Sequence, residues 1–259
     1  MAQVKPNSGF DPDSFDDAPV IGLSITHRYH DSGMHQHHRG QLMFTQQGSA
    51  RITMQNQLCL LPPMRAAWIP AGVRHRAVIQ TAEYRSVYFN HALSVPLGNE
   101  VRVIEVSPLL RAVLESMTEA PYDTDWSQGK YAYLLALCLL EVADAPKQPI
   151  VLPLPQDKRL APLLTQLEHL PPNLQTLVTR VGASGKTISR IFLRETGMGY
   201  QQWRQQWRLL RCIELLATGH SLDYCAFELG FCNDSVLIAF FKSLTGTTPR
   251  NYLKRGGGF

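Results

Sequence analysis

The sequence predicts an α+β protein, with a strand-rich N-terminal half followed by an all-helical C-terminal half. Three observations predict this class. Between about residues 20 and 90 the apolar residues fall in short, nearly alternating runs, as in half-buried strands. From residue 108 onward they recur at helical spacing. The helical half also repeats itself at an offset of 48 residues.

Composition narrows the class of protein. A chain of 259 residues with 44% hydrophobic and 18% charged residues is typical of a soluble globular protein of one or two domains. No apolar run approaches the roughly 20 residues of a membrane-spanning helix, and the polar N-terminus lacks a secretory signal, so we expect a cytoplasmic protein. The five cysteines form no C-x-x-C pair, which argues against a disulfide framework and a cysteine zinc site.

The strand-rich half consists of short runs separated by Gly, Pro and Asn. The runs are VIGLSITHRY, LMFTQQ, ARITMQ, LCLLPP, AAWIP, HRAVIQ and YRSVYFN. Strands at this spacing predict a sandwich or a small barrel. Two amphipathic helices, over residues 108–120 and 128–143, then trail the sheet and complete a first domain over residues 1–144.

A linker and a basic second domain follow. Residues 145–156, APKQPIVLPLPQ, contain four prolines and predict the linker. The next helix is expected over residues 157–170, with its leucines on one face. Residues 157–259 hold 13 Lys and Arg against 7 Asp and Glu, a net charge of +6, whereas residues 1–156 carry −2. This division favours a polyanionic partner for the second domain.

The internal repeat predicts two helix-turn-helix units. LQTLVTRVG at residues 174–182 is echoed by LDYCAFELG at residues 222–230, and a second helix follows each closing glycine. A short helix, a glycine-bearing turn and a second helix make one such unit. Residues 201–217 predict one long helix between the copies, a spacer that would hold the two second helices about one DNA turn, ~34 Å, apart.

The second helix of such a unit enters the major groove, so its outward side chains are the candidate DNA contacts. Ser184 and Asn233 are the expected N-caps. The candidates are Lys186, Thr187, Ser189, Arg190 and Arg194 in the first copy, Asp234, Ser235, Ile238, Ala239 and Lys242 in the second, and Arg204 and Arg208 on the connecting helix. We expect the first copy to read bases and the second to contribute shape, methyl and phosphate contacts.

The motif GF…FFK…G-x-T-P-x-x-Y, over residues 230–252, resembles the AraC/XylS family of transcription regulators, and ASGKTISRIFLRETGMG resembles the family's first unit. The resemblance covers about residues 157–254 and implies an AraC-type DNA-binding domain, which we assign to residues 157–255. By position it places base contacts on Lys186, Ser189, Arg190, Asp234, Ser235, Ile238 and Ala239. The chain departs from the family at Leu253, commonly Arg, and at the acidic Asp234.

The N-terminal half resembles a cupin sensor over residues 20–90. HQHHRGQLMFTQQG fits the first cupin motif, H-x-H-x(3)-E-x(6)-G, and PAGVRH fits P-x-G-x-x-H of the second. Position 41 is Gln where metal-binding cupins have Glu, and position 79 is Ile where the full motif has Asn. On a strand, His35 and His37 share one face, with Gln41 if no bulge intervenes, whereas His38 points to solvent; His75 would face them from another strand.

Two interpretations of this histidine cluster stay open. Three imidazoles and the Gln41 amide oxygen would bind a divalent metal ion such as Zn, Ni, Fe or Mn, less tightly than a site with a carboxylate. Alternatively, the same side chains line an effector pocket that holds no metal. Arg51, Trp68 and Tyr88, all on predicted strands, are further candidates for effector contacts.

Together these observations predict a sequence-specific DNA-binding transcription regulator, a homodimer joined through the two helices that trail the sheet. Its cupin-like domain would bind a small-molecule or metal effector, and an activator would also contact RNA polymerase. We expect no enzymatic activity and no cofactor other than a divalent metal ion at the histidine cluster. The alternative is a metal-dependent cupin enzyme with an appended DNA-binding domain.

Overall fold

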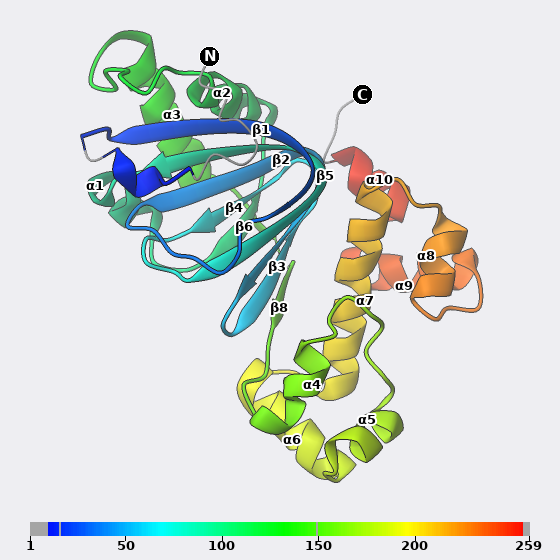
Figure 1. Ribbon diagram of the computed structural model, residues 1–259. Coiled ribbons are helices and arrows are strands. Elements are labelled where there is room, and N and C mark those ends of the chain that lie inside the picture. The colour runs from blue at the N-terminus through cyan, green and yellow to red at the C-terminus, as the bar shows by residue number, and fades with distance from the viewer. Residues whose placement is uncertain (1–9, 16, 149, 256–259) are drawn as a thin grey trace. The chain divides into compact units, whose positions relative to one another are not determined.

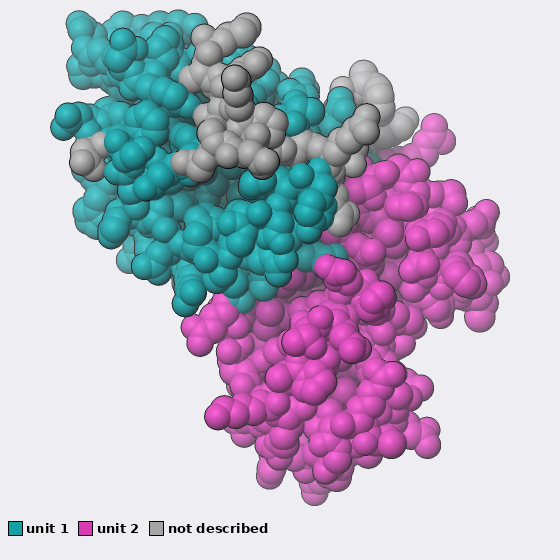
Figure 2. Space-filling model, in the orientation of Figure 1, with its two compact units in different colours: residues 1–54, 59–151, 253–259 teal, residues 55–58, 152–252 magenta. Residues whose placement is uncertain are grey.

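The computed structural model describes residues 10–15, 17–148 and 150–255 (Figure 1). The chain divides into two compact units, coloured separately in Figure 2. We name the two units after the roles that the sequence predicts for them: the sensor unit comprises residues 1–54, 59–151 and 253–259, and the DNA-binding unit comprises residues 55–58 and 152–252. The main division, after residue 151, falls within the segment that the sequence predicts as a linker, and this segment contributes two short strands to the fold.

The strands of the described residues form one eight-stranded sheet. Its order is β1-β5-β2-β4-β6-β7, and β3 pairs with both β2 and β8. The strands are β1 Val20–Asp31, β2 Gly40–Met54, β3 Gln57–Leu61, β4 Arg65–Ile69, β5 His75–Phe89, β6 Arg102–Glu105, β7 Lys147–Gln148 and β8 Val151–Pro153. Three short helical segments also belong to this half: η1 Pro12–Ser14, α1 His91–Ser94 and η2 Val95–Leu97.

Two of the longest strands each unite a pair of runs that the sequence separates. LMFTQQ and all of ARITMQ but its last residue belong to β2, which continues through Gly48 at φ 74°. The pairing of β2 with β5 shifts register on both sides of Gln47, and such a bulge lets a long strand bend without ending. HRAVIQ and all of YRSVYFN but its last residue likewise belong to β5. A glycine that looks like a turn in the sequence is therefore a bend within a strand.

The two faces of the sheet have different surroundings. Leu42 pairs with Trp68 on β4 and with Val87 on β5, and these three side chains belong to the core that packs on α2 Pro108–Thr118 and α3 Gly129–Asp144. Because side chains alternate along a strand, neighbouring positions such as Gln41 and Met43 project from the other face. The two helices expected after the sheet are confirmed, and they cover one face only (Figure 1).

The second half of the chain is helical, as predicted. Its elements are η3 Lys158–Leu160, α4 Ala161–Leu164, α5 Leu174–Val181, α6 Gly185–Thr196, α7 Tyr200–Ala217, α8 Leu222–Glu228, α9 Asp234–Thr245 and α10 Pro249–Arg255. The single helix expected over residues 157–170 is wrong: only η3 and α4 form there. Pro162 lacks the N–H that would continue the first turn, so a new helix begins beside it. Within the described ranges, no helix combines the length and the apolarity needed to cross a membrane.

The predicted repeat is confirmed in its backbone. α5 with α6, and α8 with α9, are two helix-turn-helix units on either side of α7 (Figure 1). Ser184 and Asn233 cap the second helices by accepting the amide hydrogens of Thr187 and Val236. Left-handed glycines stand at matching places: Gly182 and Gly230 in the turns, and Gly197 and Gly246 at the ends of the second helices, with φ between 67° and 73°. A side chain is strained at this φ, which explains the glycines.

Buried side chains recur at matching positions of the two helix-turn-helix units. Leu177, Ile188 and Phe192 in the first correspond to Cys225, Leu237 and Phe241 in the second, and all six are buried. On α7, Trp203 and Trp207 are buried, and their indole nitrogens donate to the carbonyl oxygens of Pro153 at 2.7 Å and Leu167 at 3.1 Å. These bonds fix α7 against the segment that enters the unit.

Candidate functional site

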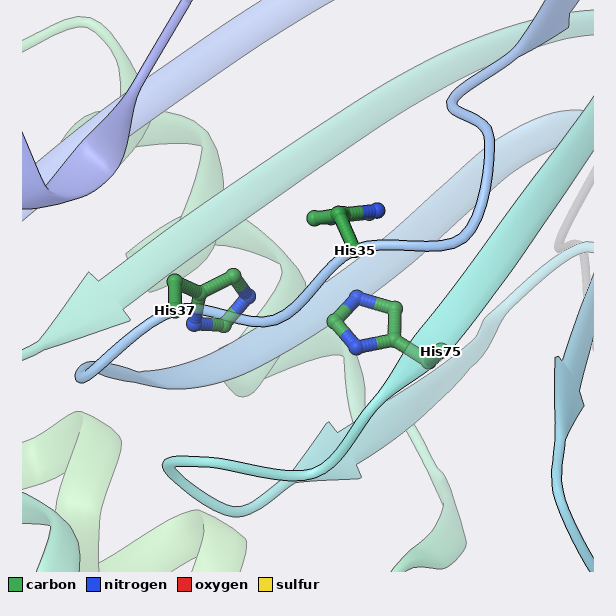
Figure 3. A group of neighbouring side chains, drawn as sticks. All are labelled: His35, His37 and His75. Atoms are coloured by element: carbon green, nitrogen blue, oxygen red, sulfur yellow. The ribbon is translucent and has the colours of Figure 1, made fainter.

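His35, His37 and His75 form the histidine cluster of the sensor unit (Figure 3). One ring nitrogen of each lies within 4.8 Å of those of the other two. The ring centroids of His35 and His75 are 4.4 Å apart, and those of His37 and His75 are 5.2 Å apart. The two sequence motifs that predict the cluster are therefore brought together in the fold.

The backbone that brings them together differs from the prediction. His35 and His37 do not lie on one strand; they lie in the segment over residues 32–39, between β1 and β2. His35 and His75 instead exchange two backbone hydrogen bonds as an isolated bridge, at 2.9 and 2.8 Å, and the amide of Gly72 donates to the carbonyl of His37 at 2.8 Å. The loop is thus held against the start of β5 by its main chain.

All three rings have the same hydrogen-bonded orientation. The Nδ1 atom of each lies within hydrogen-bond distance of a backbone carbonyl oxygen two residues away. The acceptors for His35, His37 and His75 are the carbonyls of Gly33 at 3.1 Å, Arg39 at 2.6 Å and Val73 at 2.8 Å. Because a carbonyl oxygen only accepts, each Nδ1 carries the hydrogen, and each Nε2 of a neutral ring keeps its lone pair.

Burial keeps the inner rings neutral. His37 is 4% exposed and His75 is fully buried. Burial lowers the pKa of His37 and lowers that of His75 to about 4, since a charged ring loses hydration there. The Nε2 of His75 is buried and has no hydrogen-bond partner among the described residues. A buried polar atom without a partner is unusual and indicates a group that awaits one.

Gln41 faces the cluster from the second residue of β2. Its Oε1 lies 3.2 Å from the Nε2 of His37, while its Nε2 donates to the Ser86 hydroxyl at 2.8 Å and the Tyr88 hydroxyl at 3.1 Å. Gln41 is 2% exposed and pairs in register with Tyr88. With the ring hydrogen on Nδ1, the His37 nitrogen and the Gln41 oxygen turn lone pairs toward each other. A positively charged group between them would satisfy both.

Only one of the three candidate effector residues lies beside the cluster. The Tyr88 ring is 5.4 Å from that of His37, and burial raises the pKa of its hydroxyl well above the usual value, so the hydroxyl stays protonated. The prediction for Trp68 is wrong, because its fully buried side chain is on the helix-covered face and donates to the Gly98 carbonyl at 2.9 Å.

Arg51, the third candidate for an effector contact, also lies away from the cluster. It pairs with Val78 on β5, whereas His75 pairs with Met54, three residues further along β2. Cross-strand partners share a face and faces alternate along a strand, so Arg51 and His75 project from opposite faces. His38, in contrast, is solvent-exposed as expected, and its ring pairs with Asp13 at 2.9 Å.

The second candidate site is the outer face of α6. Lys186, Arg190 and Arg194 recur at every fourth residue and are exposed, and Arg194 also pairs with Glu195 at 2.5 Å. The predicted candidates between them, Thr187 and Ser189, are half-buried. The opposite face of the helix is buried, as predicted: Ile188, Ile191 and Phe192 are at most 1% exposed. This geometry suits entry into a DNA groove.

The three positions of α9 that match the cations of α6 carry no cation. Aligning the caps and buried residues of the two units at an offset of 49 gives Ser235, Ala239 and Ser243 as the counterparts of Lys186, Arg190 and Arg194, and all three are exposed. The other candidates on α9 lie beside them: Lys242 is exposed, and Asp234 and Ile238 are half-buried. The two units thus share a backbone but differ in outer chemistry.

Arg204 and Arg208 of α7 are less exposed to solvent than the sequence suggests. The Nε of Arg204 donates to the Pro171 carbonyl at 2.6 Å, and the guanidinium of Arg208 lies 4.8 Å from the ring centroid of Phe231. Both are half-buried. These contacts stabilise the unit itself, and contact of the two arginines with DNA stays a prediction. Their partners lie 23 or more residues away in the sequence, so helical spacing does not reveal them.

Comparison with known families matches both halves. Residues 18–132 match the family described as "AraC-like ligand binding domain", and residues 177–255 match a "Helix-turn-helix domain". The chain belongs to the AraC family of transcription regulators. This AraC-family protein is accordingly a DNA-binding transcription regulator with a ligand-binding domain.

Two similar proteins are HTH-type transcriptional regulators, and one solved structure also aligns with most of the chain. The HTH-type transcriptional regulator NimR of Escherichia coli is 26% identical over 254 residues, 96% of this chain and 92% of NimR. The HTH-type transcriptional regulator RipA of Corynebacterium glutamicum is 35% identical over 71 residues, 27% of this chain and 22% of RipA. The crystal structure of fatty-acid-bound ToxT from Vibrio cholerae aligns over 93% of this chain and 96% of ToxT, at 12% identity and a TM-score of 0.37.

Proposed function

We propose that this AraC-family regulator is a homodimer whose affinity for a specific DNA sequence changes when an effector binds at the histidine cluster of the sensor unit. The observation that carries the proposal is the exposed cationic face of α6, because three cations at fourth-residue spacing suit phosphates and guanine edges in a major groove. If the bound protein activates transcription, RNA polymerase is its further partner.

Genome-wide mapping of bound DNA, followed by fluorescence anisotropy on the recovered sequence, tests DNA recognition. Arg190→Ala should weaken binding by about 1–3 kcal/mol and relax the preference at one base pair. Arg159→Ala is the matched control, because it removes an arginine of the same unit whose guanidinium already pairs with Asp157 at 2.6 Å. Equal losses in the two variants would contradict base recognition by α6.

Two contacts connect the sheet of the sensor unit to α2. Arg85 of β5 donates to the Thr118 hydroxyl of α2 at 2.9 Å, and Gly22 of β1 packs directly on the backbone of the same turn. We propose that the effector shifts this packing and thereby the spacing of the DNA-binding units in the dimer. A coupling of about 1–3 kcal/mol is enough to change DNA affinity 5- to 150-fold.

The dimer surface that we propose is the outer side of α2 and α3. Tyr133 and Leu140, seven residues apart on α3, are 79% and 62% exposed, and Leu109 of α2 is 48% exposed. Apolar side chains this exposed on adjacent helices suit a second copy of the same surface. Tyr133→Asp with Leu140→Asp should yield monomers in light scattering after size-exclusion chromatography. Asp144→Asn, at the exposed end of the same helix, should leave the mass unchanged.

We propose binding without turnover at the histidine cluster. Residue 41 is an amide, which neither takes up nor releases a proton near neutral pH, so it offers no general acid or base beside the rings. The enzyme alternative requires a product to form in the presence of the occupied cluster. Effector candidates recovered chemically unchanged after prolonged incubation with the protein would support binding alone.

A further inference from the structure

The geometry points to a divalent first-row transition-metal ion as the effector of the sensor unit, held by the Nε2 atoms of His35, His37 and His75 with the Oε1 of Gln41 as fourth ligand. Metal binding stands on this geometry alone. Its regulatory role rests on the function proposed above, and the experiments separate the two.

The spacing of the rings is close to that of a formed site. One ring nitrogen from each histidine lies within 4.8 Å of the other two, so a common point exists no more than about 2.8 Å from all three. Bonds from zinc to histidine are about 2.0–2.1 Å, so each ring has to approach by less than about 1 Å. Small side-chain rotations achieve this, because His35 is only half-buried and lies in a loop.

The rings are already turned for coordination. A metal-binding histidine almost always donates its other ring hydrogen to a carbonyl or carboxylate, which fixes its orientation. All three rings here do so through Nδ1 to carbonyl oxygens of their own segments. The buried and unpartnered Nε2 of His75 independently indicates a ligand beside that ring.

Gln41 is held as the fourth ligand would be. Donation from its amide nitrogen to the Ser86 and Tyr88 hydroxyls turns its oxygen toward His37. Two ligands on a tetrahedral ion with bonds of about 2.0–2.1 Å lie about 3.3 Å apart. The observed separation of the Gln41 oxygen and the His37 Nε2 is 3.2 Å. Two lone pairs at this distance repel each other in isolation and are both satisfied by a cation.

The donor set narrows the kind of ion. Three imidazoles with one amide oxygen suit Zn²⁺, Co²⁺, Ni²⁺ or Fe²⁺, whereas Mg²⁺ and Ca²⁺ prefer all-oxygen sites. The set has no formal negative charge, so it binds more weakly than the same set with a carboxylate. Weaker binding lets the ion leave more readily when its supply falls.

Titration of the chelator-stripped full-length protein tests the site. Co²⁺ should produce a tetrahedral visible absorption spectrum, and isothermal titration with Zn²⁺ should give one ion per chain. His35→Ala and His75→Ala should each weaken binding roughly tenfold or more. His38→Ala is the matched control, because this neighbouring ring is exposed. Absence of binding, or equal losses in all three variants, would overturn the site.

A Gln41→Glu variant gives a sharper test that does not depend on weakening the fold. A carboxylate at the fourth ligand supplies the missing negative charge, so Zn²⁺ affinity should rise by roughly tenfold or more. If the rings instead line a pocket for an organic ligand and Gln41 serves only as a hydrogen-bond partner, the substitution should leave Zn²⁺ binding unchanged or weaker. That result would overturn the assignment of Gln41 and, with it, the proposed ligand set.

Anisotropy on the mapped DNA, with and without Zn²⁺, tests the role of the ion. A metal-dependent shift in affinity that His75→Ala abolishes and His38→Ala keeps supports the effector role. Stoichiometric metal binding without such a shift overturns that role. Sequence-specific DNA binding by a chain that takes up no metal overturns this inference while leaving the proposed regulator in place.

Discussion

The contact between β1 and α2 offers a quantitative test of how the sensor unit is built. Gly22 lies where a Cβ would come within 2.4 Å of the Met117 carbonyl oxygen and 2.6 Å of the Thr118 Cα. Ordinary contacts begin near 3.4 Å, so Gly22→Ala requires the last turn of α2 to recede by about 1 Å. Both obstructing atoms belong to the backbone, so no side-chain rotation relieves them.

The expected magnitude follows from this displacement. A gap of 0.5–1 Å forfeits roughly a quarter to a half of the dispersion energy of a contact, and overpacked cores lose about 1–3 kcal/mol. We expect Gly22→Ala to reach the upper end of that range, because the helix moves as a body and the Arg85 bond to Thr118 lengthens.

Hydrogen exchange of full-length protein is the assay, because it reports on each segment separately in a chain with two units. In Gly22→Ala, amides of α2 and β1 should exchange faster, and a loss of about 3 kcal/mol corresponds to roughly 150-fold. Ser24→Ala, two residues along the same strand, should change exchange little. Protection of α2 equal in Gly22→Ala and the wild type would refute the argument from close packing.

Three further outcomes follow from single contacts. Arg208→Ala should lower the stability of the DNA-binding unit by about 0.5–2 kcal/mol in urea denaturation, because the stacking on Phe231 is lost; an unchanged midpoint would contradict a structural role. Ser184→Ala should remove about 1 kcal/mol by uncapping α6, and Ser184→Asp should restore it. Arg76→Ala should lose the stabilisation of Asp31, whose pKa its hydrogen bond lowers to about 2. A depressed carboxyl pKa stabilises the fold above about pH 4 and ceases to do so as pH falls toward 2, so the difference in melting temperature between Arg76→Ala and the wild type should shrink over that interval.

The helical half could be predicted from the sequence because its determinants are local. Apolar spacing, a cap such as Ser184 and a closing glycine such as Gly197 act within a few residues of one another, and they mark helices at the right places. The division of the expected helix over residues 157–170 into η3 and α4 has an equally local cause, since Pro162 lacks the N–H that would join the two segments.

The histidine cluster could be predicted only in part. The spacing of two motifs identified His35, His37 and His75, but the backbone bridge that joins them depends on contacts between distant segments. The face of the sheet from which Arg51 and Trp68 project depends on strand register. A bulge at Gln47 shifts this register, and the sequence does not reveal it. The hydrogen bonds from the Gln41 amide to the Ser86 and Tyr88 hydroxyls depend on the same register, so the sequence does not reveal them either.

The unequal outer faces of α6 and α9 give the DNA site a direction. One chain presents cations at residues 186, 190 and 194, and small neutral side chains at the counterpart positions of the second unit. Turning the duplex end for end would exchange the segments that these helices meet and would place the cations on the wrong one. If both helices contact DNA, a single chain binds an asymmetric sequence in one polarity only, so the direction of each half-site fixes which way the bound chain faces relative to the promoter. A dimer that binds two half-sites pointing the same way cannot be symmetric about a twofold axis across its whole length.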